Sequence, residues 1–208
     1  SGRIDALCSE LLGAVAHEER FDLVRDFTVP LPVIIIAELL GVERHRVADF
    51  KRWSNSLVAI INGADGDARQ QALGEVFELA NYLSEAADQR RRKRSDDLIG
   101  TLVVAEREEA RLTPGEVLSY CILLLAAGNE TTTNLIGGLV AALAAHPEQL
   151  ALLQRDPTLI DTAIEEGLRY CSPVQGLFRR VNTDTRLGDV VIPAGSRVWV
   201  GYAAANHD

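Results

Sequence analysis

The sequence VLSYCILLLAAGNETTTNLIGGLVAALAA, residues 117–145, decides how the rest of the chain is interpreted. It predicts one helix, about 45 Å long at 1.5 Å per residue, that is apolar on nearly every face. Thr113-Pro114-Gly115-Glu116 precedes it and forms a capping box with proline at the first helical position, which sets where the helix begins. On hydropathy alone, this helix is a candidate to span a membrane.

The polar run NETTTN, residues 129–134, argues against a membrane span, because an ionisable carboxylate is costly in lipid. The sequence therefore predicts a buried central helix of a soluble protein. Two interpretations of the polar run remain open. In one, threonine hydroxyls bond back to carbonyls one turn earlier and bend the helix. In the other, Ala127 and Gly128 leave a groove, while Glu130 and Thr131 place a carboxyl and a hydroxyl at a cavity for proton transfer.

The flanking sequence predicts a mainly α-helical fold with a small antiparallel sheet near the C-terminus. Valine-rich sequence at residues 176–199, with turn residues at 188–189 and 193–195, predicts the short strands. A turn is expected over residues 21–32 and a break at 62–66. Apolar residues at helical spacing predict helices at residues 4–15, 33–40, 43–61, 67–90, 95–104, 147–155 and 159–170.

Two details concern the boundary between the helices at 67–90 and 95–104. Ser95 is the expected N-cap of the second helix. The basic run RRRKR, residues 90–94, is expected at the C-terminal end of the first, where positive charge suits the free carbonyls and water covers the side chains. A docking patch for an acidic partner is the alternative.

Composition narrows the class of protein. The 208 residues, 47% apolar and 25% charged, favour one globular domain whose core needs no disulfide or metal. The net charge of −9 argues against a general nucleic-acid binder, because phosphate contacts need a basic face. Cys8, Cys121 and Cys171 lack any C-x-x-C pairing, so neither a disulfide framework nor a zinc site is indicated, and we expect a cytoplasmic protein.

A second motif is Glu166-Gly167-Leu168-Arg169, which places opposite charges three residues apart on one helix face. Such a pair contributes only about 0.3 kcal/mol when exposed and is common, so it is uninformative alone.

Together the two motifs resemble the bacterial soluble cytochrome P450 family of haem-thiolate monooxygenases. The run LAAGNETT, residues 125–132, looks like the long oxygen-activating helix of that family, and Glu166-x-x-Arg169 looks like its E-x-x-R motif. The resemblance runs through the whole chain. It also includes LPVIIIAELLGV at 31–42, SPVQ at 172–175, Arg179 five residues before Asp184, IPAG at 192–195 and AANHD at 204–208.

The resemblance implies roles for particular residues. Glu130 and Thr131 would be catalytic and relay protons during dioxygen activation. Ala127 and Gly128 would make room for dioxygen beside the haem, which Thr131 would also contact, and Arg179 would pair with a haem propionate. Haem b is the cofactor implied for the parent protein.

By the same resemblance, Glu166 and Arg169 would be structural and hold the core on the haem side. A substrate pocket above the haem would take an apolar small molecule. Its expected lining residues are Leu123, Ala126, Val174 and Leu177.

The sequence departs from the family at both ends. The Gly- and Phe-containing loop that carries the thiolate ligand is not among these residues, and none of the three cysteines lies in such a motif. The early Trp-x-x-x-Arg motif is also missing, since Trp53 is followed by Leu57. Residues 1–208 are therefore expected to be the middle portion of a cytochrome P450 domain, with no axial cysteine and no stably bound haem.

Two functions follow from these observations. The first is a piece, inactive by itself, of a monooxygenase that inserts one oxygen atom of O2 into an apolar small molecule, with electrons from a ferredoxin-type donor. No nucleic acid or membrane is expected as a partner, whereas self-association of the chain is, because apolar helix faces lose their neighbours. The alternative is a haem-free relative that acts through protein contacts, for example by activating a glycosyltransferase.

Overall fold

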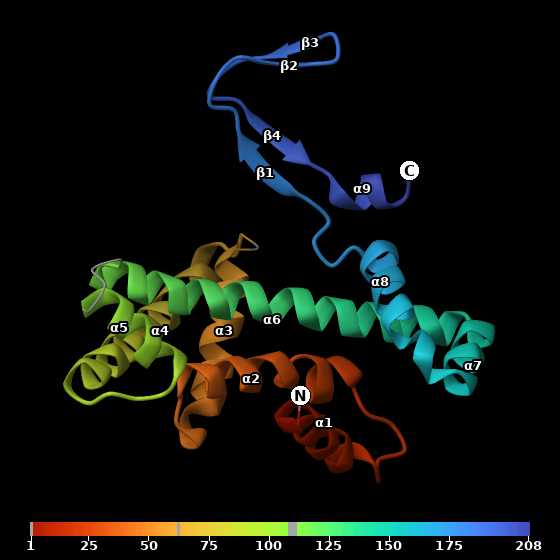
Figure 1. The fold of residues 1–208 in the computed structure, drawn as a ribbon, viewed down its shortest axis with the longest axis horizontal. Helices are drawn as coiled ribbons and strands as arrows, with labels where there is room; N and C mark the ends of the chain where they lie inside the picture. The colour runs from red at the N-terminus through yellow and green to blue at the C-terminus, as the bar shows by residue number, and fades with distance from the viewer. Residues whose placement is uncertain (1, 62, 108–111) are drawn as a thin grey trace. The chain divides into compact units, whose positions relative to one another are not determined.

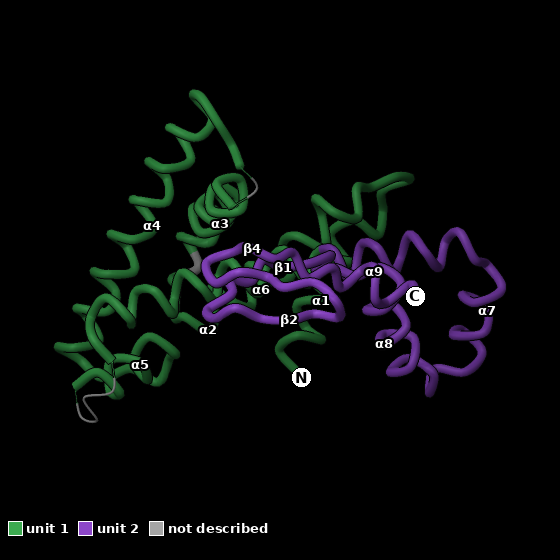
Figure 2. Tube along the Cα trace, turned by 90° about the horizontal axis from the view of Figure 1, so that it is seen from above, with its two compact units in different colours: residues 1–133 green, residues 134–208 purple. Residues whose placement is uncertain are grey.

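The computed structural model describes residues 2–61, 63–107 and 112–208. It divides into two compact units, residues 1–133 and 134–208, which Figure 2 shows in different colours and which are treated separately below. Helix α6, Pro114–Ala145, is continuous and contributes residues to both units.

The first unit is entirely helical in its described residues. Helices α3 and α4 lie side by side, and the first part of α6 completes the unit (Figure 1). The elements are α1 (Gly2–Val15), a π-helical turn (Val24–Thr28), α2 (Pro30–Leu40), a 3-10 turn (Arg44–Arg46), α3 (Val47–Ile61), α4 (Gly66–Arg92) and α5 (Leu98–Arg107). The core draws on all of α2 to α6 and includes Val33, Leu40, Phe50, Trp53, Leu79, Leu83, Ile99, Val103, Val117 and Leu125.

The second unit joins helices to a small sheet. Strands β1 and β4 pair antiparallel with Leu177 opposite Val200, and β2 and β3 form a hairpin whose turn uses Gly188 at φ +58°. The elements are the end of α6, α7 (Pro147–Arg155), a 3-10 turn (Pro157–Leu159), α8 (Ile160–Cys171), β1 (Leu177–Arg180), β2 (Thr185–Leu187), β3 (Val190–Ile192), β4 (Arg197–Val200) and α9 (Tyr202–Asn206). The predicted fold class, mainly α with a small antiparallel sheet near the C-terminus, is confirmed.

Most predicted helices are present, with shifted ends. The helix predicted from residue 33 begins at Pro30, because proline is tolerated in the first turn, where no intrahelical partner is needed for its nitrogen. Within the predicted turn at 21–32, the residues Val24–Thr28 form the π-helical turn instead. The predicted break at 62–66 includes residue 62, which lies outside the described residues.

The capping box at the start of α6 is confirmed. The Glu116 N–H donates to Thr113 Oγ1 at 3.3 Å, and the Thr113 N–H donates to Glu116 Oε2 at 2.7 Å. These reciprocal bonds satisfy two amide groups at the helix start and hold α6 to its predicted beginning.

Burial of α6 is confined to one stripe. Val117, Cys121, Leu125 and Asn129 are buried at a spacing of four residues, whereas Leu123 is 60% exposed. Burial on every face is therefore not found in this chain. In the part of the chain that is described, no single helix has the length and apolarity to cross a bilayer. Helices α6 and α7 meet these criteria only when counted together, and the chain bends by 105° between them.

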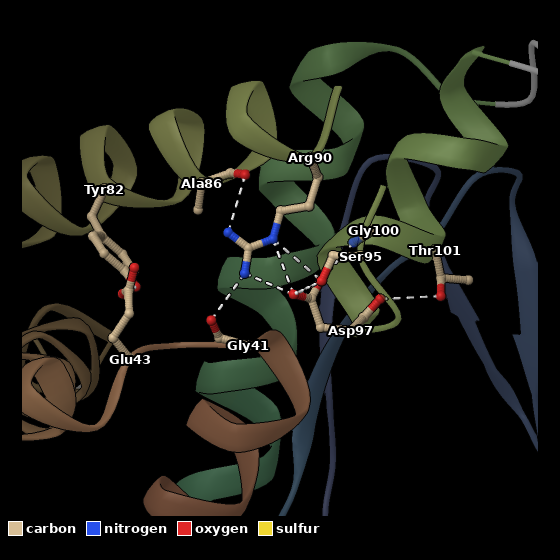
Figure 3. A network of polar contacts seen from close by, with 9 residues as sticks. All are labelled: Gly41, Glu43, Tyr82, Ala86, Arg90, Ser95, Asp97, Gly100 and Thr101. Atoms are coloured by element: carbon tan, nitrogen blue, oxygen red, sulfur yellow. Dashed lines mark hydrogen bonds and ion pairs between the residues drawn. The ribbon is translucent and has the colours of Figure 1, made fainter. Parts of the chain in front are cut away.

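The basic run at residues 90–94 is not simply a water-covered helix end. Arg90 Nη2 donates to Asp97 Oδ2 at 2.7 Å and to the Gly41 carbonyl at 2.9 Å, as Figure 3 shows. Arg91 Nη2 likewise donates to Glu106 Oε2 at 2.7 Å. The prediction was wrong for these two arginines, because α5 folds back and brings its carboxylates to the end of α4.

The predicted N-cap of α5 is also wrong. Asp97, and not Ser95, accepts the Gly100 N–H, at 2.8 Å, while the Ser95 hydroxyl donates to Asp97 at 2.7 Å. Burial acts to raise the pKa of Asp97. Hydrogen bonds from Arg90, Ser95 and the Gly100 N–H outweigh it, so that the pKa of Asp97 lies below its ordinary value.

Replacement of Asp97 tests this network. Asp97→Asn leaves the Arg90 guanidinium, whose side chain is only 11% exposed, without its counterion, and should lower the free energy of unfolding by about 3 kcal/mol at pH 7. Because the pKa of Asp97 is lowered, the stability it contributes is complete above about pH 4 and is lost as the pH falls through the folded-state pKa.

Urea unfolding between pH 2 and pH 7 measures both effects. The unfolding free energy of the parent protein should fall more steeply below pH 4 than that of Asp97→Asn. The exposed neighbour Asp96 supplies the control, since Asp96→Asn should change the stability at pH 7 by under about 0.5 kcal/mol. Equal losses in the two variants would contradict the role given to Asp97.

Glycine is required at position 41 for two physical reasons. Gly41 ends α2 at φ +73°, and a Cβ there would overlap the Asp97 carboxylate. Gly41→Ala should therefore destabilise the protein by about 3 kcal/mol, from the left-handed backbone and the displaced ion pair together. Gly74→Ala is the matched control, because a Cβ at Gly74 on α4 meets no atom within 4 Å; it should stabilise by about 0.5–1 kcal/mol. Thermal unfolding of both variants measures the contrast.

Candidate functional site

The polar segment of α6 has an inner face that is fully engaged in the first unit. Asn129 is 4% exposed, and its Nδ2 donates to Ser54 Oγ on α3 at 2.6 Å. Thr133 Oγ1 donates to the Thr28 carbonyl at 2.9 Å. We call Thr28, Ser54, Asn129 and Thr133 the inner polar layer. The Thr28 hydroxyl is itself buried and has no hydrogen-bond partner among the described residues.

The outer face of the same segment carries the residues expected to be functional. Ala127 is exposed and Thr131 is half-buried, and Thr131 Oγ1 donates to the Ala127 carbonyl at 2.8 Å. This is the back-bond expected if threonine hydroxyls only bend the helix. This bond uses the hydroxyl proton, and the oxygen can still accept a hydrogen bond from another group. The catalytic interpretation of Thr131 and of half-buried Glu130 remains a prediction.

Gly128 has a packing role that the sequence did not indicate. A Cβ at Gly128 would lie 2.8 Å from Ile36 Cδ1 of α2, which is too close for an ordinary contact. The glycine therefore lets α6 approach α2. On the outer face Ala127 is the small residue beside Thr131, and the assignment of Ala127 and Gly128 to a dioxygen groove remains a prediction.

In the second unit, Glu166 and Arg169 form the expected pair. Arg169 Nη2 and Nε donate to the two carboxylate oxygens of Glu166 at 2.6 and 2.8 Å, and the hydrogen bond from Arg169 lowers the pKa of Glu166. Arg169 Nη1 also donates to the Asn206 carbonyl at 2.7 Å. Both side chains are about half exposed, so water screens the ion pair. The bond from Arg169 to the Asn206 carbonyl joins α8 to α9.

Arg179 on β1 is the residue expected to pair with a haem propionate, and this role remains a prediction. It is exposed, its Nη2 donates to the Tyr202 hydroxyl at 3.1 Å, and among the described residues no carboxylate pairs with it. An arginine with a neutral partner and an open side fits a carboxylate group such as a haem propionate.

The cysteines lie outside the Gly- and Phe-containing loop that is expected to carry the haem-thiolate ligand. Burial raises the pKa of Cys121 to about 11 and also raises the pKa of Cys171, which disfavours the thiolate form of both side chains when no metal is bound. Cys8 lies on α1, which the resemblance does not connect with iron ligation. Within the described residues, no group of three or more His, Cys, Asp or Glu side chains could hold a metal ion.

The second unit contains a pocket of about 490 Å³ between its helices, lined by residues that include His146, Leu153, Glu166 and Tyr170. The predicted substrate-contacting residues do not line it. Two of them, Leu123 and Ala126, lie in the first unit and the other two, Val174 and Leu177, lie in the second. Their common pocket remains a prediction.

The long helix with a polar break, the following helix with the E-x-x-R pair and the small sheet are the features on which the resemblance to the cytochrome P450 family rests. Residues 155–208 match the family model described as Cytochrome P450. The whole chain is similar to longer proteins, both curated relatives and solved structures.

Cytochrome P450 107B1 of Saccharopolyspora erythraea is 44% identical over 207 residues, which are 99% of this chain and 50% of that protein. Vitamin D(3) 25-hydroxylase of Pseudonocardia autotrophica is 40% identical over 208 residues, again 99% of this chain and 50% of the relative. The structure of Cytochrome P450 CYP109Q5 from Chondromyces apiculatus matches all of this chain and 51% of that one, with a TM-score of 0.89 and 44% identity.

The chain is therefore similar to cytochromes P450 over nearly its whole length, and residues 155–208 match the model of that family. It spans about half the length of the curated relatives it matches.

Proposed function

We propose that the protein containing these residues is a haem-dependent monooxygenase of the bacterial cytoplasm. It inserts one oxygen atom of O2 into an apolar small molecule, while two electrons and two protons reduce the other atom to water. The observation that carries the proposal is the 44% identity to a cytochrome P450 over 99% of the chain. Residues 1–208 are proposed to form part of one cytochrome P450 domain.

When bound, haem b would supply the activation of dioxygen. The residues of this chain would hold the haem in place and supply protons beside it. Arg179 would hold a propionate through the guanidinium that has no carboxylate partner in the described residues. The thiolate ligand would come from outside residues 1–208, because none of the three cysteines lies in the Gly- and Phe-containing loop that the resemblance implies for it.

Thr131 is proposed as the last residue of a proton path that leads from solvent through Glu130 to the haem side of α6. Its Oγ1 proton is held toward the Ala127 carbonyl at 2.8 Å, and rotation about one side-chain bond turns it away from that carbonyl toward the open side of the helix. Glu130, the adjacent half-buried carboxyl, would return a proton to Thr131 from solvent. Ala127 leaves space beside the hydroxyl because its side chain is a single methyl group.

The substrate is proposed to be apolar and the electron donor to be ferredoxin-like. Leu123 and Ala126 precede Thr131 on α6 by eight and five residues, which are about two turns and one and a half turns, and both are apolar. With Val174 and Leu177 they would line the substrate pocket. One relative is named for the hydroxylation of vitamin D(3), an apolar molecule, which supports this substrate class.

The carbon monoxide difference spectrum tests the proposal. The reduced, haem-loaded whole protein should show the Soret band of a thiolate-ligated haem, whereas residues 1–208 alone should show none, because they lack a suitable thiol. Absence of the band from the whole protein would overturn the proposal and favour a haem-free auxiliary protein. A thiolate band from residues 1–208 alone would contradict the assignment of the ligand to another part of the protein.

Thr131→Ala tests the proton donor in the whole enzyme. The fraction of consumed dioxygen recovered in product should fall by roughly tenfold, because a positioned proton donor is lost, while the substrate Kd is retained. Oxygen uptake, product yield and a binding titration measure the three quantities.

Thr101→Ala is the matched control. Thr101 Oγ1 donates to the Asp97 carbonyl at 3.2 Å, the same back-bond on another helix, so this variant removes an equivalent hydrogen bond away from the site. Its ratio of product to oxygen should equal that of the parent. If Thr131→Ala behaves like Thr101→Ala, Thr131 is only a helix-bending residue.

A further inference from the structure

The hydrogen bond between Asn129 and Ser54 joins two buried side chains that are 75 residues apart in sequence. Asn129 is 4% exposed and Ser54 is fully buried. A buried amide or hydroxyl that loses its partner lowers the folding equilibrium constant by about tenfold or more. The folded chain therefore strongly favours arrangements in which Asn129 and Ser54 remain hydrogen-bonded to each other.

Apolar packing next to Asn129 selects the rotation of α6 only weakly. Residues 121–125 are CILLL, so rotation of the helix by one position would replace Leu125 in the core by Leu124, although it would also replace Val117 by Glu116 at the start of the helix. The same rotation would carry Asn129 away from Ser54. The polar pair is thus the contact that distinguishes most strongly between rotations at this turn of the helix, as a single buried asparagine does in coiled coils.

A second polar contact lies on the same side of α6. Thr133, one turn after Asn129, donates to the Thr28 carbonyl at 2.9 Å, in the segment before α2. The inner polar layer therefore fixes α6 against two different elements, α3 and the π-helical turn.

The outer face follows from the inner one. Successive residues of an α-helix are about 100° apart, so Thr131 lies about 200° from Asn129, and Ala127 lies as far on the other side. With Asn129 turned inward, both residues point away from it on the helix; Ala127 is exposed and Thr131 is half-buried. We infer that Asn129, held by Ser54, is a positioning residue that directs Ala127 and Thr131 toward the reacting groups. The inference rests on the proposed function of Thr131.

A double-mutant cycle on the whole protein tests the pair. Ser54→Ala and Asn129→Leu should each lower the folding equilibrium constant by about tenfold, because each leaves one buried polar group unpaired. The double variant should be at least as stable as the less stable of the two single variants, since it contains neither polar group. Additive losses would overturn the inference. If Asn129→Leu does not fold alone, Asn129→Ser replaces it in the cycle.

A reporter thiol separates positioning from stability. Thr131→Cys is alkylated with iodoacetamide in each background, and the modified peptide is identified by mass spectrometry, which distinguishes position 131 from Cys8, Cys121 and Cys171. In the double variant the alkylation rate at position 131 should change several-fold, because the rotation of α6 is no longer selected. An unchanged rate would overturn the inference.

The control is Ile99→Val on α5, which lowers stability by deletion of one buried methyl group and leaves the inner polar layer intact. Its reporter rate should equal that of the parent; a change as large as that in the double variant would assign the effect to stability and overturn the inference. The thiol reporter does not depend on haem chemistry. Loss of the Thr131 proposal through unchanged oxygen coupling in Thr131→Ala is therefore distinguishable from loss of the positioning inference.

Discussion

The hydrogen bond from the Asn129 amide to the Ser54 hydroxyl determines which side of α6 is available for chemistry. The helix is 32 residues long and apolar along most of its surface, so around Asn129 hydrophobic burial alone discriminates only weakly between orientations. A buried polar pair permits one, because every other orientation leaves two groups without hydrogen bonds. The position of Ala127 and Thr131 on the side of the helix opposite Asn129 is the direct consequence.

Other contacts of the first unit support this orientation. Gly128 lets α6 approach Ile36 of α2, and the end of α2 is held in turn by the Arg90 side chain through the Gly41 carbonyl. Arg90 also pairs with Asp97 at the start of α5. The helices that pack around the inner polar layer are therefore tied together by a second, partly buried network, which limits how far they can shift.

Local sequence was sufficient to predict most of the fold. Helical periodicity and the capping box at Thr113 describe relations between residues close in sequence, and these were confirmed. The errors arose where the path of the chain brings a partner back. Arg90 resembled a solvated charge because the Gly41 carbonyl is distant in sequence and Asp97 reaches Arg90 only through the turn after α4. Ser95 and Asp97 are equally good caps until the Gly100 N–H is located.

The candidate site shows the same division. Spacing of four residues is enough to place Ala127 and Thr131 on one face of a helix, and the resemblance to cytochromes P450 assigned them a role. Nothing in the local sequence marks Asn129, whose partner Ser54 lies on α3. Which face of α6 is open depends on that distant contact, and so it required the structure.

Nuclear magnetic resonance of the Asn129 side-chain amide tests the central claim most directly. The account predicts nuclear Overhauser effects between the Asn129 Nδ2 protons and the Ser54 side chain, and slow exchange of one Nδ2 proton with water. Fast exchange of both protons, without effects to Ser54, would contradict it, since α6 would then be oriented by apolar packing alone.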